Sequence, residues 1–368
     1  MGSVTDRKKM LQKFKGRLVT ALPTPCIVAD LEALEANLEK MDGFFSGSTC
    51  NLRPHFKSHK CVTLARRQME FPNTTGITCA KLSEAEQLVA GGIGDVLIAN
   101  QVIGTDKTDR IAKMNRTAVV RVAVDSQPGI EQLGISALKA GVEIGVLVEV
   151  DIGMNRGGVK PGRPVLELAK LITSTDGVRL DGLQSYEGHV VTLPDYGERK
   201  SRVKKDMHPL LETRALLEQN GFSVLVSSGG TGTYDITGKL EGIDEMQVGS
   251  YALMDAAYKT IRPEFLNARH ILATVISKRG DVISTDVGLK GMGTEYGSPA
   301  AIGYPDAENL YVAEEHTVFK NLEAQIGDKI RIIPPHGCTT NNFYPYMWIS
   351  RDDVIIDIWP IEGRGCIE

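Results

Sequence analysis

The segment RPHFKSHK, residues 53–60, is the sharpest local feature of the chain. Side chains alternate between the two faces of a β-strand, so Arg53, His55, Lys57 and His59 would share one face. A lysine crowded by other cations gives up its proton more readily than a solvated one, and a neutral amine can form a Schiff base with an aldehyde. A basic surface loop would have the same composition, and the segment alone does not separate the two interpretations.

Two glycine-rich segments lie much further along the chain. They read SSGGTGTYD at 227–235 and QVGSYALMD at 247–255. The backbone N–H groups of such turns can bind a phosphate group. Most glycine-rich turns are only turns, so these segments indicate a phosphate site only in combination with other features.

Two further motifs carry a cation and a pair of metal-binding side chains. Arg156 lies in VEVDIGMNRGGV, residues 148–159, and its guanidinium could bind an anionic oxygen. His336 and Cys338 lie in IIPPHGCTTNN, residues 332–342. On an extended segment they would point the same way and could share a metal ion. Simple packing is the commoner explanation of an isolated His-x-Cys pair.

The segments that must position these residues follow a βα rhythm, in which short β-branched runs alternate with amphipathic helical patterns. Eight strands are predicted, at 51–57, 76–80, 95–100, 118–124, 145–152, 179–187, 223–230 and 245–252. Eight strands with intervening helices predict a (β/α)8 TIM barrel. An open doubly wound sheet is disfavoured because it usually has fewer strands and because no GxGxxG motif opens the first βα turn.

In such a barrel the carboxyl ends of the strands form one face, where the active site is built. Lys57 would end the first strand, Arg156 would follow the fifth, and the glycine-rich loops would follow the seventh and eighth. A lysine for an aldehyde together with a cradle for a phosphate suggests pyridoxal 5'-phosphate.

After about residue 265 the pattern changes to short alternating strands separated by Gly, Asp and Pro turns, which predict an all-β domain. We therefore predict a barrel over residues 26–264 and a β domain formed by residues 1–25 and 265–368.

The composition favours a folded enzyme of small molecules. The chain has 368 residues and a net charge of −4, which gives no electrostatic sign of a nucleic-acid partner. No run approaches the about 20 apolar residues that span a bilayer, and the basic N-terminus lacks the apolar core of a secretory signal. Six cysteines without a CxxC motif are typical of reduced thiols, so a cytoplasmic location is expected.

Taken together, these motifs resemble the D-threonine aldolase / D-serine dehydratase family, which are fold type III pyridoxal phosphate enzymes with an alanine racemase-like barrel. The resemblance runs from TPCIVADLEALEANLEKM to DIWPIEGRG, nearly the whole chain. Its specific blocks are RPHFKSHK, KLSEAEQLVAGGI, VEVDIGMNRGGV, LQSYEG, SGGTGTYD, GSYALMDAAY, DVGLK, EEHTV and PPHGCTTNN.

The resemblance implies a role for each candidate residue. Lys57 would carry the cofactor as a Schiff base, Arg156 would lie near its phenolic oxygen, and Tyr186 would lie beside its pyridine ring. The phosphate would be held by Ser228, Gly229, Gly230, Thr231 and Gly232 and by the turn Gly249, Ser250 and Tyr251. His336 and Cys338 would bind a divalent metal (Mn, Mg or Zn) near the substrate β-hydroxyl. A homodimer is also implied.

The family contains two reactions on small D-configured β-hydroxy amino acids. Retro-aldol cleavage gives glycine and an aldehyde, with His189 or His59 as the proton acceptor, and it is the predicted activity. The alternative is β-elimination of substrates such as D-serine or D-threo-3-hydroxyaspartate to a 2-oxo acid and ammonia. Cys338, and Thr192 where aldolases usually carry a histidine, favour the elimination, whereas LQSYEG, SGGTG and GSYALMDAAY resemble the aldolase branch.

Two other activities are disfavoured. Alanine racemases carry a different run after the lysine from the Ser58-His59-Lys60 found here. A non-catalytic pyridoxal phosphate carrier is a barrel alone and would lack the domain that holds His336 and Cys338.

Overall fold

The computed structural model describes residues 4–368 as two compact units. The first, called the barrel unit, comprises Asp42–Lys57, Leu64–Gly249 and Cys366–Glu368. The second, called the β unit, comprises the chain up to Met41 together with Ser58–Thr63 and Ser250–Gly365.

The barrel unit is built on a curled sheet of eight parallel strands in the order β2-β9-β8-β7-β6-β5-β4-β3. The strands are β2 (Asn51–Leu52), β3 (Ile77–Cys79), β4 (Asp95–Ile98), β5 (Val119–Val124), β6 (Ile144–Glu149), β7 (Val178–Gln184), β8 (Leu225–Ser228) and β9 (Glu245–Met246). Isolated parallel bridges from Leu52 to Thr74 and from His55 to Thr78 link the two ends of the sheet. All eight predicted strands are present, and the predicted barrel is confirmed.

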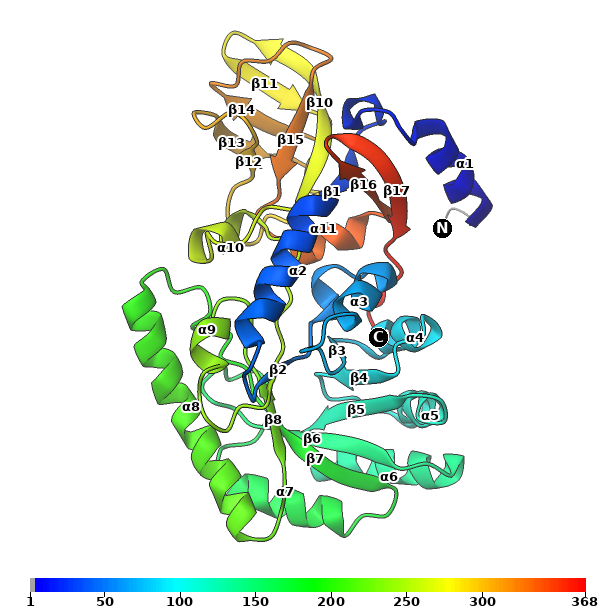
Figure 1. The fold of residues 1–368 in the computed structure, drawn as a ribbon, viewed down its shortest axis with the longest axis vertical. Helices are drawn as coiled ribbons and strands as arrows, with labels where there is room; N and C mark the ends of the chain where they lie inside the picture. The colour runs from blue at the N-terminus through cyan, green and yellow to red at the C-terminus, as the bar shows by residue number, and fades with distance from the viewer. Residues whose placement is uncertain (1–3) are drawn as a thin grey trace. The chain divides into compact units, whose positions relative to one another are not determined.

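Helices cover the outside of this sheet (Figure 1). They are α4 (Leu82–Ala90), α5 (Thr105–Met114), α6 (Gln127–Ala140), α7 (Arg163–Thr173) and α8 (Tyr196–Gln219). Every residue of β6 is buried, as expected for a parallel strand that packs on both faces. Short helices α3 (Val62–Met69) and α9 (Tyr234–Thr237) follow β2 and β8 in the chain.

The first strand is shorter than predicted, and the predicted common face of Arg53, His55, Lys57 and His59 is wrong. The strand β2 ends at Leu52, and Phe56–Ser58 form a turn of 3₁₀ helix, η2. Pro54 has no N–H to donate, and the helical turn replaces the strand alternation at Lys57.

Arg53 takes part in an ion-pair cluster of the barrel wall. Its Nε and Nη2 donate to the two carboxylate oxygens of Glu245 at 2.7 and 2.6 Å, and its Nη1 donates to Asp95 at 2.6 Å. The side chain is buried. Arg53 therefore ties the first strand to β9 and β4.

The β unit contains the predominantly antiparallel strands of the second sheet, in the order β13-β14-β11-β10-β1-β16-β17, with β15 pairing both β10 and β12. Their bounds are β1 (Cys26–Asp30), β10 (Arg269–Arg279), β11 (Val282–Thr285), β12 (Ala300–Ala301), β13 (Glu308–Val312), β14 (Thr317–Lys320), β15 (Lys329–Ile333), β16 (Tyr346–Arg351) and β17 (Val354–Pro360). The predicted strand-rich C-terminal half is confirmed.

Helices α1 (Val4–Phe14), α10 (Ala256–Ile261) and α11 (Gly337–Phe343) and the 3₁₀ turn η1 (Val19–Ala21) complete this unit, and α2 (Leu31–Phe45) continues past Met41. Part of its core is formed by Phe14, Val28, Leu272 and Trp348, and the Phe14 and Trp348 rings meet edge to face at 5.5 Å. None of the helices within residues 4–368 is long and apolar enough to cross a membrane.

The strand β1 lies inside the range that the sequence pattern assigned to the barrel. It pairs antiparallel with β10 and parallel with β16. These pairs join residues at least 240 positions apart, so the local pattern of β1 does not reveal its partners. The domain limits at 25/26 and 264/265 stay a prediction.

Candidate active site

Two predicted cofactor residues, Lys57 and Arg156, lie around the ring of a third, Tyr186, in the barrel unit. Tyr186 follows β7, Lys57 lies on η2, and Arg156 lies in the loop after β6. Lys57 Nζ is 5.7 Å from the centroid of the Tyr186 ring, and Arg156 Cζ is 5.8 Å from it. The structure therefore brings together side chains that are up to 129 residues apart.

The glycine-rich loop after β8 packs against the same ring. A Cβ atom added to Gly230 would lie 3.3 Å from Tyr186 Cε2, and one added to Gly232 would overlap the carbonyl oxygen of Val191. Gly229 has φ of +80°, a conformation that favours glycine. The loop can pass this close to Tyr186 and Val191 only because Gly230 and Gly232 lack side chains.

Ser228 and Thr231 in this loop are buried. The Ser228 hydroxyl lies 2.8 Å from the Ser185 hydroxyl and 3.1 Å from the Ser185 carbonyl. Ser228 thus uses its side chain in the barrel wall, so its own contact with a phosphate would come from its backbone.

Glu187 anchors the loop, and sequence reasoning missed it. The residue is fully buried, and its Oε1 accepts hydrogen bonds from Thr233 Oγ1 and Thr237 Oγ1, both at 2.6 Å. Burial raises the pKa of Glu187, although the hydrogen bonds from both threonines oppose the shift. No sequence pattern links a glutamate after β7 to threonines 46 and 50 residues later.

Arg156 has an acidic partner at the end of β6. Its Nη2 lies 3.7 Å from Glu149 Oε1, and Gln101 Nε2 donates to Glu149 Oε2 at 2.5 Å. Burial raises the pKa of Glu149, whereas Gln101 and Arg156 favour its ionised form. The Arg156 side chain is about half exposed, so it can still meet an anion.

His189 is held by Asp206 from α8, a partner that the sequence did not indicate. The His189 Nε2 and Asp206 Oδ2 atoms are 2.8 Å apart. The other nitrogen, Nδ1, is buried and has no hydrogen-bond partner among the described residues. The ring lies against Gly153, where an added Cβ would be 3.1 Å from Nε2. His189 is therefore a paired, partly buried histidine and not a surface one.

The two predicted metal ligands lie together in the β unit, at the start of α11. His336 is the N-cap residue of this helix, so the extended segment expected from the sequence ends here. His336 and Cys338 are hydrogen-bonded to each other, and Glu295 Oε1 lies 2.5 Å from His336 Nδ1. Burial lowers the pKa of His336, but Cys338 and Glu295 outweigh burial and raise it to about 9.

Gly337, the residue between His336 and Cys338, is hydrogen-bonded through both its N–H and its carbonyl. The Gly337 N–H donates to Asp255 at 2.9 Å, and its carbonyl accepts from Arg269 Nη1 at 3.2 Å. A Cβ on Gly337 would overlap the buried Arg269 guanidinium. This arrangement fixes the backbone from which the His336 and Cys338 side chains project.

The imidazole of His336 and the thiol of Cys338 form a donor set that suits a divalent transition metal. Within residues 4–368 no group of three or more His, Cys, Asp or Glu side chains is placed to hold a metal ion. A metal here would thus have two protein ligands and further positions for water or substrate oxygen.

Ser58 and His59 also belong to the β unit. The Ser58 hydroxyl lies 3.5 Å from Cys338 Sγ, and Asn341 donates to the Ser58 carbonyl at 2.7 Å. His59 is fully buried, and its Nδ1 accepts the Cys61 N–H at 3.2 Å.

The predicted phosphate turn at 249–251 falls at a unit limit. Gly249 ends a segment of the barrel unit, and Ser250 and Tyr251 begin one of the β unit. The Ser250 carbonyl accepts from Met254 N at 2.8 Å, and buried Tyr251 meets the Phe265 ring edge to face at 6.0 Å.

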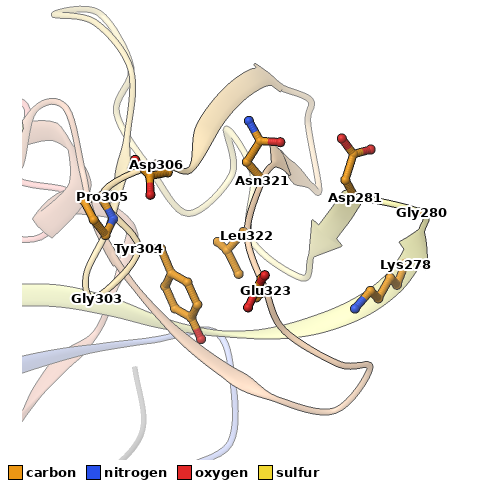
Figure 2. A pocket seen from close by; sticks show the side chains of 10 residues that line it. All are labelled: Lys278, Gly280, Asp281, Gly303, Tyr304, Pro305, Asp306, Asn321, Leu322 and Glu323. Atoms are coloured by element: carbon orange, nitrogen blue, oxygen red, sulfur yellow. The ribbon is translucent and has the colours of Figure 1, made fainter.

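A separate hollow of about 790 Å³ lies in the β unit (Figure 2). Its lining residues are Lys278, Gly280, Asp281, Gly303, Tyr304, Pro305, Asp306, Asn321, Leu322 and Glu323. None of the predicted site residues lines it, and the Lys278 amine is bonded to the Ala324 carbonyl at 2.8 Å. The hollow is not part of the candidate active site.

Comparison with known proteins assigns the family. Residues 29–256 match the model of the alanine racemase N-terminal domain, and residues 268–350 match that of the serine dehydratase domain. The D-threonine aldolase of Arthrobacter sp is 35% identical over 360 residues, covering 95% of each chain. The chain belongs to the D-threonine aldolase / D-serine dehydratase family.

Two other members of this family are similar over nearly their whole length. The 3-hydroxy-D-aspartate aldolase of Paracoccus denitrificans (strain Pd 1222) is 33% identical over 358 residues, covering 94% of this chain and 92% of the relative. The crystal structure of D-threonine aldolase from Filomicrobium marinum has a TM-score of 0.94 at 34% identity, covering 96% of this chain and 99% of that one. Family dehydratases match at 22–25% identity. The predicted family, its fold and its lyase class are confirmed.

Proposed function

We propose that this chain is a pyridoxal 5'-phosphate and divalent metal-dependent lyase that cleaves small D-β-hydroxy amino acids into glycine and an aldehyde. The observation that carries the proposal is the gathering of Lys57, Arg156 and the Gly230 backbone around the Tyr186 ring. The higher identity to aldolases than to dehydratases supports retro-aldol cleavage as the reaction.

The residues of the barrel unit fit the cofactor. Lys57 would supply the amine that holds it covalently, and Tyr186 would offer a flat ring for its pyridine face. Arg156 would bind its phenolic oxygen, and the backbone of 228–232 and Gly249 would hold its phosphate, whereas the contribution of Ser250 and Tyr251 stays a prediction. When bound, pyridoxal phosphate withdraws electrons from the substrate Cα, which stabilises negative charge there.

Glu187 contributes by holding the phosphate loop in place, because it bonds both threonines that follow the loop. Glu149 keeps Arg156 at the site through a weak ion pair. Neither residue needs to touch the substrate to act in this way.

His336 and Cys338 would hold the metal, and Zn, Mn or Mg are candidates. The thiol of Cys338 favours Zn over Mg by ligand preference. A divalent metal makes a nearby β-hydroxyl more acidic.

The proton of the β-hydroxyl would pass to an imidazole. In His59 the Nδ1 lone pair accepts the Cys61 N–H, so the neutral ring carries its hydrogen on Nε2, and His59 could take the proton only at Nδ1 after this bond is broken. In His189 the Nε2 atom is bonded to Asp206, so Nδ1 would take the proton once the ring becomes accessible.

One observation favours a second candidate reaction. Cys338 stands where aldolase members of the family typically have aspartate and dehydratase members have cysteine. In that reaction Lys57 would remove the Cα proton and the β-hydroxyl would leave as hydroxide, giving a 2-oxo acid and ammonia.

We also propose that the protein is a cytoplasmic homodimer. The cysteine usage supports the cytoplasmic location, and the family resemblance supports the homodimer.

A product assay separates the two reactions. The protein is incubated with D-threonine or D-serine in the presence of Mn²⁺ or Zn²⁺. Glycine with acetaldehyde from D-threonine is expected, whereas 2-oxobutyrate or pyruvate with ammonia and no glycine would overturn the aldolase proposal.

The cofactor lysine has its own test. Lys57→Ala should abolish the visible absorption band of the enzyme-bound cofactor, because the Schiff base can no longer form. Lys113→Ala, which removes an exposed lysine of α5, is the matched control and should keep the band. A band that persists in Lys57→Ala would show that another amine carries the cofactor.

A further inference from the structure

The loop between β11 and β12 brings a carboxylate to one nitrogen of His336. Glu295 Oε1 is 2.5 Å from His336 Nδ1, and Thr339 Oγ1 is 3.2 Å from the same atom. Thr339 also hydrogen-bonds the Glu295 carboxylate. The side of the ring that carries Nδ1 is therefore occupied by protein acceptors.

The backbone holds this loop against the start of α11. The His336 N–H donates to the Gly293 carbonyl at 3.4 Å, and the Gly293 N–H donates to Thr340 Oγ1 at 3.1 Å. A Cβ on Gly293 would overlap Thr339 Oγ1 and lie 2.8 Å from Glu295 Oε2. The loop can place Glu295 beside His336 because residue 293 is a glycine.

The neighbouring ring restricts the imidazole further. The Tyr296 and His336 ring centroids are 4.4 Å apart with an interplanar angle of 54°. Rotation of the imidazole by half a turn would place the carbon Cδ2 where Nδ1 now lies, and it would break the bond to Glu295.

The bond to Glu295 decides which nitrogen of a neutral His336 carries the proton. A carboxylate can only accept, so Nδ1 keeps the hydrogen and Nε2 keeps the lone pair. A histidine that binds a metal commonly donates its other N–H to a carboxylate in this way, which fixes the ring orientation and makes the ligand atom more basic.

We propose that Glu295 is the positioning residue of the metal site, which presents His336 Nε2 beside Cys338 as the ligand pair. The inference rests on the proposed function in one respect, the metal at His336 and Cys338. Glu295 is 41 residues away from His336 in the sequence and belongs to none of the predicted site motifs.

If Glu295 only stabilised the fold, its loss would lower the stability of the protein and not its affinity for the metal. The Glu295 side chain is 40% exposed, and ion pairs at that exposure contribute little to folding. Loss of Glu295 should therefore leave the fold intact while it weakens metal binding.

The test measures the dissociation constant for Zn²⁺ on the full-length, cofactor-loaded protein after removal of metal with a chelator. Zn²⁺ is titrated against a chromophoric competitor for the wild type, Glu295→Ala, Glu295→Gln and Glu315→Ala. Glu315→Ala is the matched control, because Glu315 is also an ion-paired glutamate of the β unit, but its partner is Lys290. Urea unfolding of each variant checks the fold.

We expect Glu295→Ala to weaken Zn²⁺ binding about 10- to 100-fold, the usual range for loss of a residue that supports a metal ligand. Glu295→Gln should recover part of this loss, because its amide oxygen still accepts the Nδ1 hydrogen. Glu315→Ala should bind like the wild type.

Several results would overturn the inference. Binding by Glu295→Ala within twofold of the wild type would remove Glu295 from the metal site. Equal losses in the alanine and glutamine variants would make Glu295 a direct ligand and not a positioning residue. A wild type that binds no Zn²⁺ would instead refute the metal site of the proposed function, and this inference with it.

Discussion

The ion pair of Arg53 allows a matched test of how burial changes the worth of a salt bridge. Arg53 binds Glu245 through Nε and Nη2 at 2.7 and 2.6 Å, with side-chain exposures of 3% and 8%. Arg110 binds Glu86 through the same two atoms at 2.8 and 2.6 Å, with exposures of 32% and 34%. Both arginines also have a second acidic partner. The two sites differ mainly in exposure to water.

Arg53→Met would remove the charge but keep much of the apolar stem. Glu245 would be left as a buried carboxylate without its cation, whereas Asp95 would keep its bond to Arg121 at 2.7 Å. Breaking a buried pair in this way costs about 3–5 kcal/mol of unfolding free energy. The same substitution at Arg110 should cost about 0–1 kcal/mol, because water can solvate Glu86.

Urea unfolding followed by far-ultraviolet circular dichroism would measure the two losses. Both tryptophans, Trp348 and Trp359, lie in the β unit, so their fluorescence follows that unit and the dichroism also follows the barrel. We expect the barrel transition of Arg53→Met to move to clearly lower urea than that of Arg110→Met. Equal shifts, or a loss below about 1 kcal/mol for Arg53→Met, would refute the reasoning from burial.

Three further predictions concern single residues. Thr237→Val removes a buried hydrogen-bond donor to Glu187 and should lower the free energy of unfolding, measured in urea, by about 1–3 kcal/mol. Thr237→Ser keeps the hydroxyl and should unfold close to the wild type. An unchanged urea midpoint for Thr237→Val would contradict this prediction. Gly232→Ala should weaken pyridoxal phosphate binding in an absorbance titration, because its Cβ would overlap the Val191 carbonyl and move the loop. An unchanged affinity would show that this loop does not bind the phosphate. Burial lowers the pKa of His270 from 6.5 to about 3, and Arg331 adds to the shift. The contribution of neutral His270 to the free energy of unfolding is therefore fully present above pH 6.5 and is lost as the pH falls toward 3, by about 1.4 kcal/mol per pH unit. His270→Phe should flatten this dependence of the unfolding free energy on pH.

The parts of the fold that follow local patterns were predictable. The strands β3 to β9 lie within the predicted ranges, except that β6 and β7 each begin one residue earlier. A buried parallel strand needs a short β-branched run, and each run is bounded by helical or turn residues. The extent of β2 was not predictable to the same degree. Its length depends on Pro54 and on the turn at Phe56–Ser58, which interrupt an otherwise acceptable alternation.

The residues of the candidate site also fall into a predictable and an unpredictable group. Lys57, Arg156, the glycine-rich loop and the His336/Cys338 pair each stand in a motif whose residue types indicate their chemistry. Glu187, Asp206 and Glu295 do not, because a single carboxylate between ordinary neighbours has no distinctive sequence signal. Each was found through its partner in space.

The sequence by itself determined the parallel barrel, the strand-rich second half and the types of group that can hold an aldehyde, a phosphate and a metal, since these depend on local periodicity and composition. Only the tertiary structure decided that Arg53 supports the barrel wall, that β1 pairs with β10 and β16, and that carboxylates 17 to 50 residues from their partners hold His189, His336 and the phosphate loop. The physical reason is that a buried polar group must find a partner wherever the folded backbone brings one, and that distance along the chain does not enter this requirement.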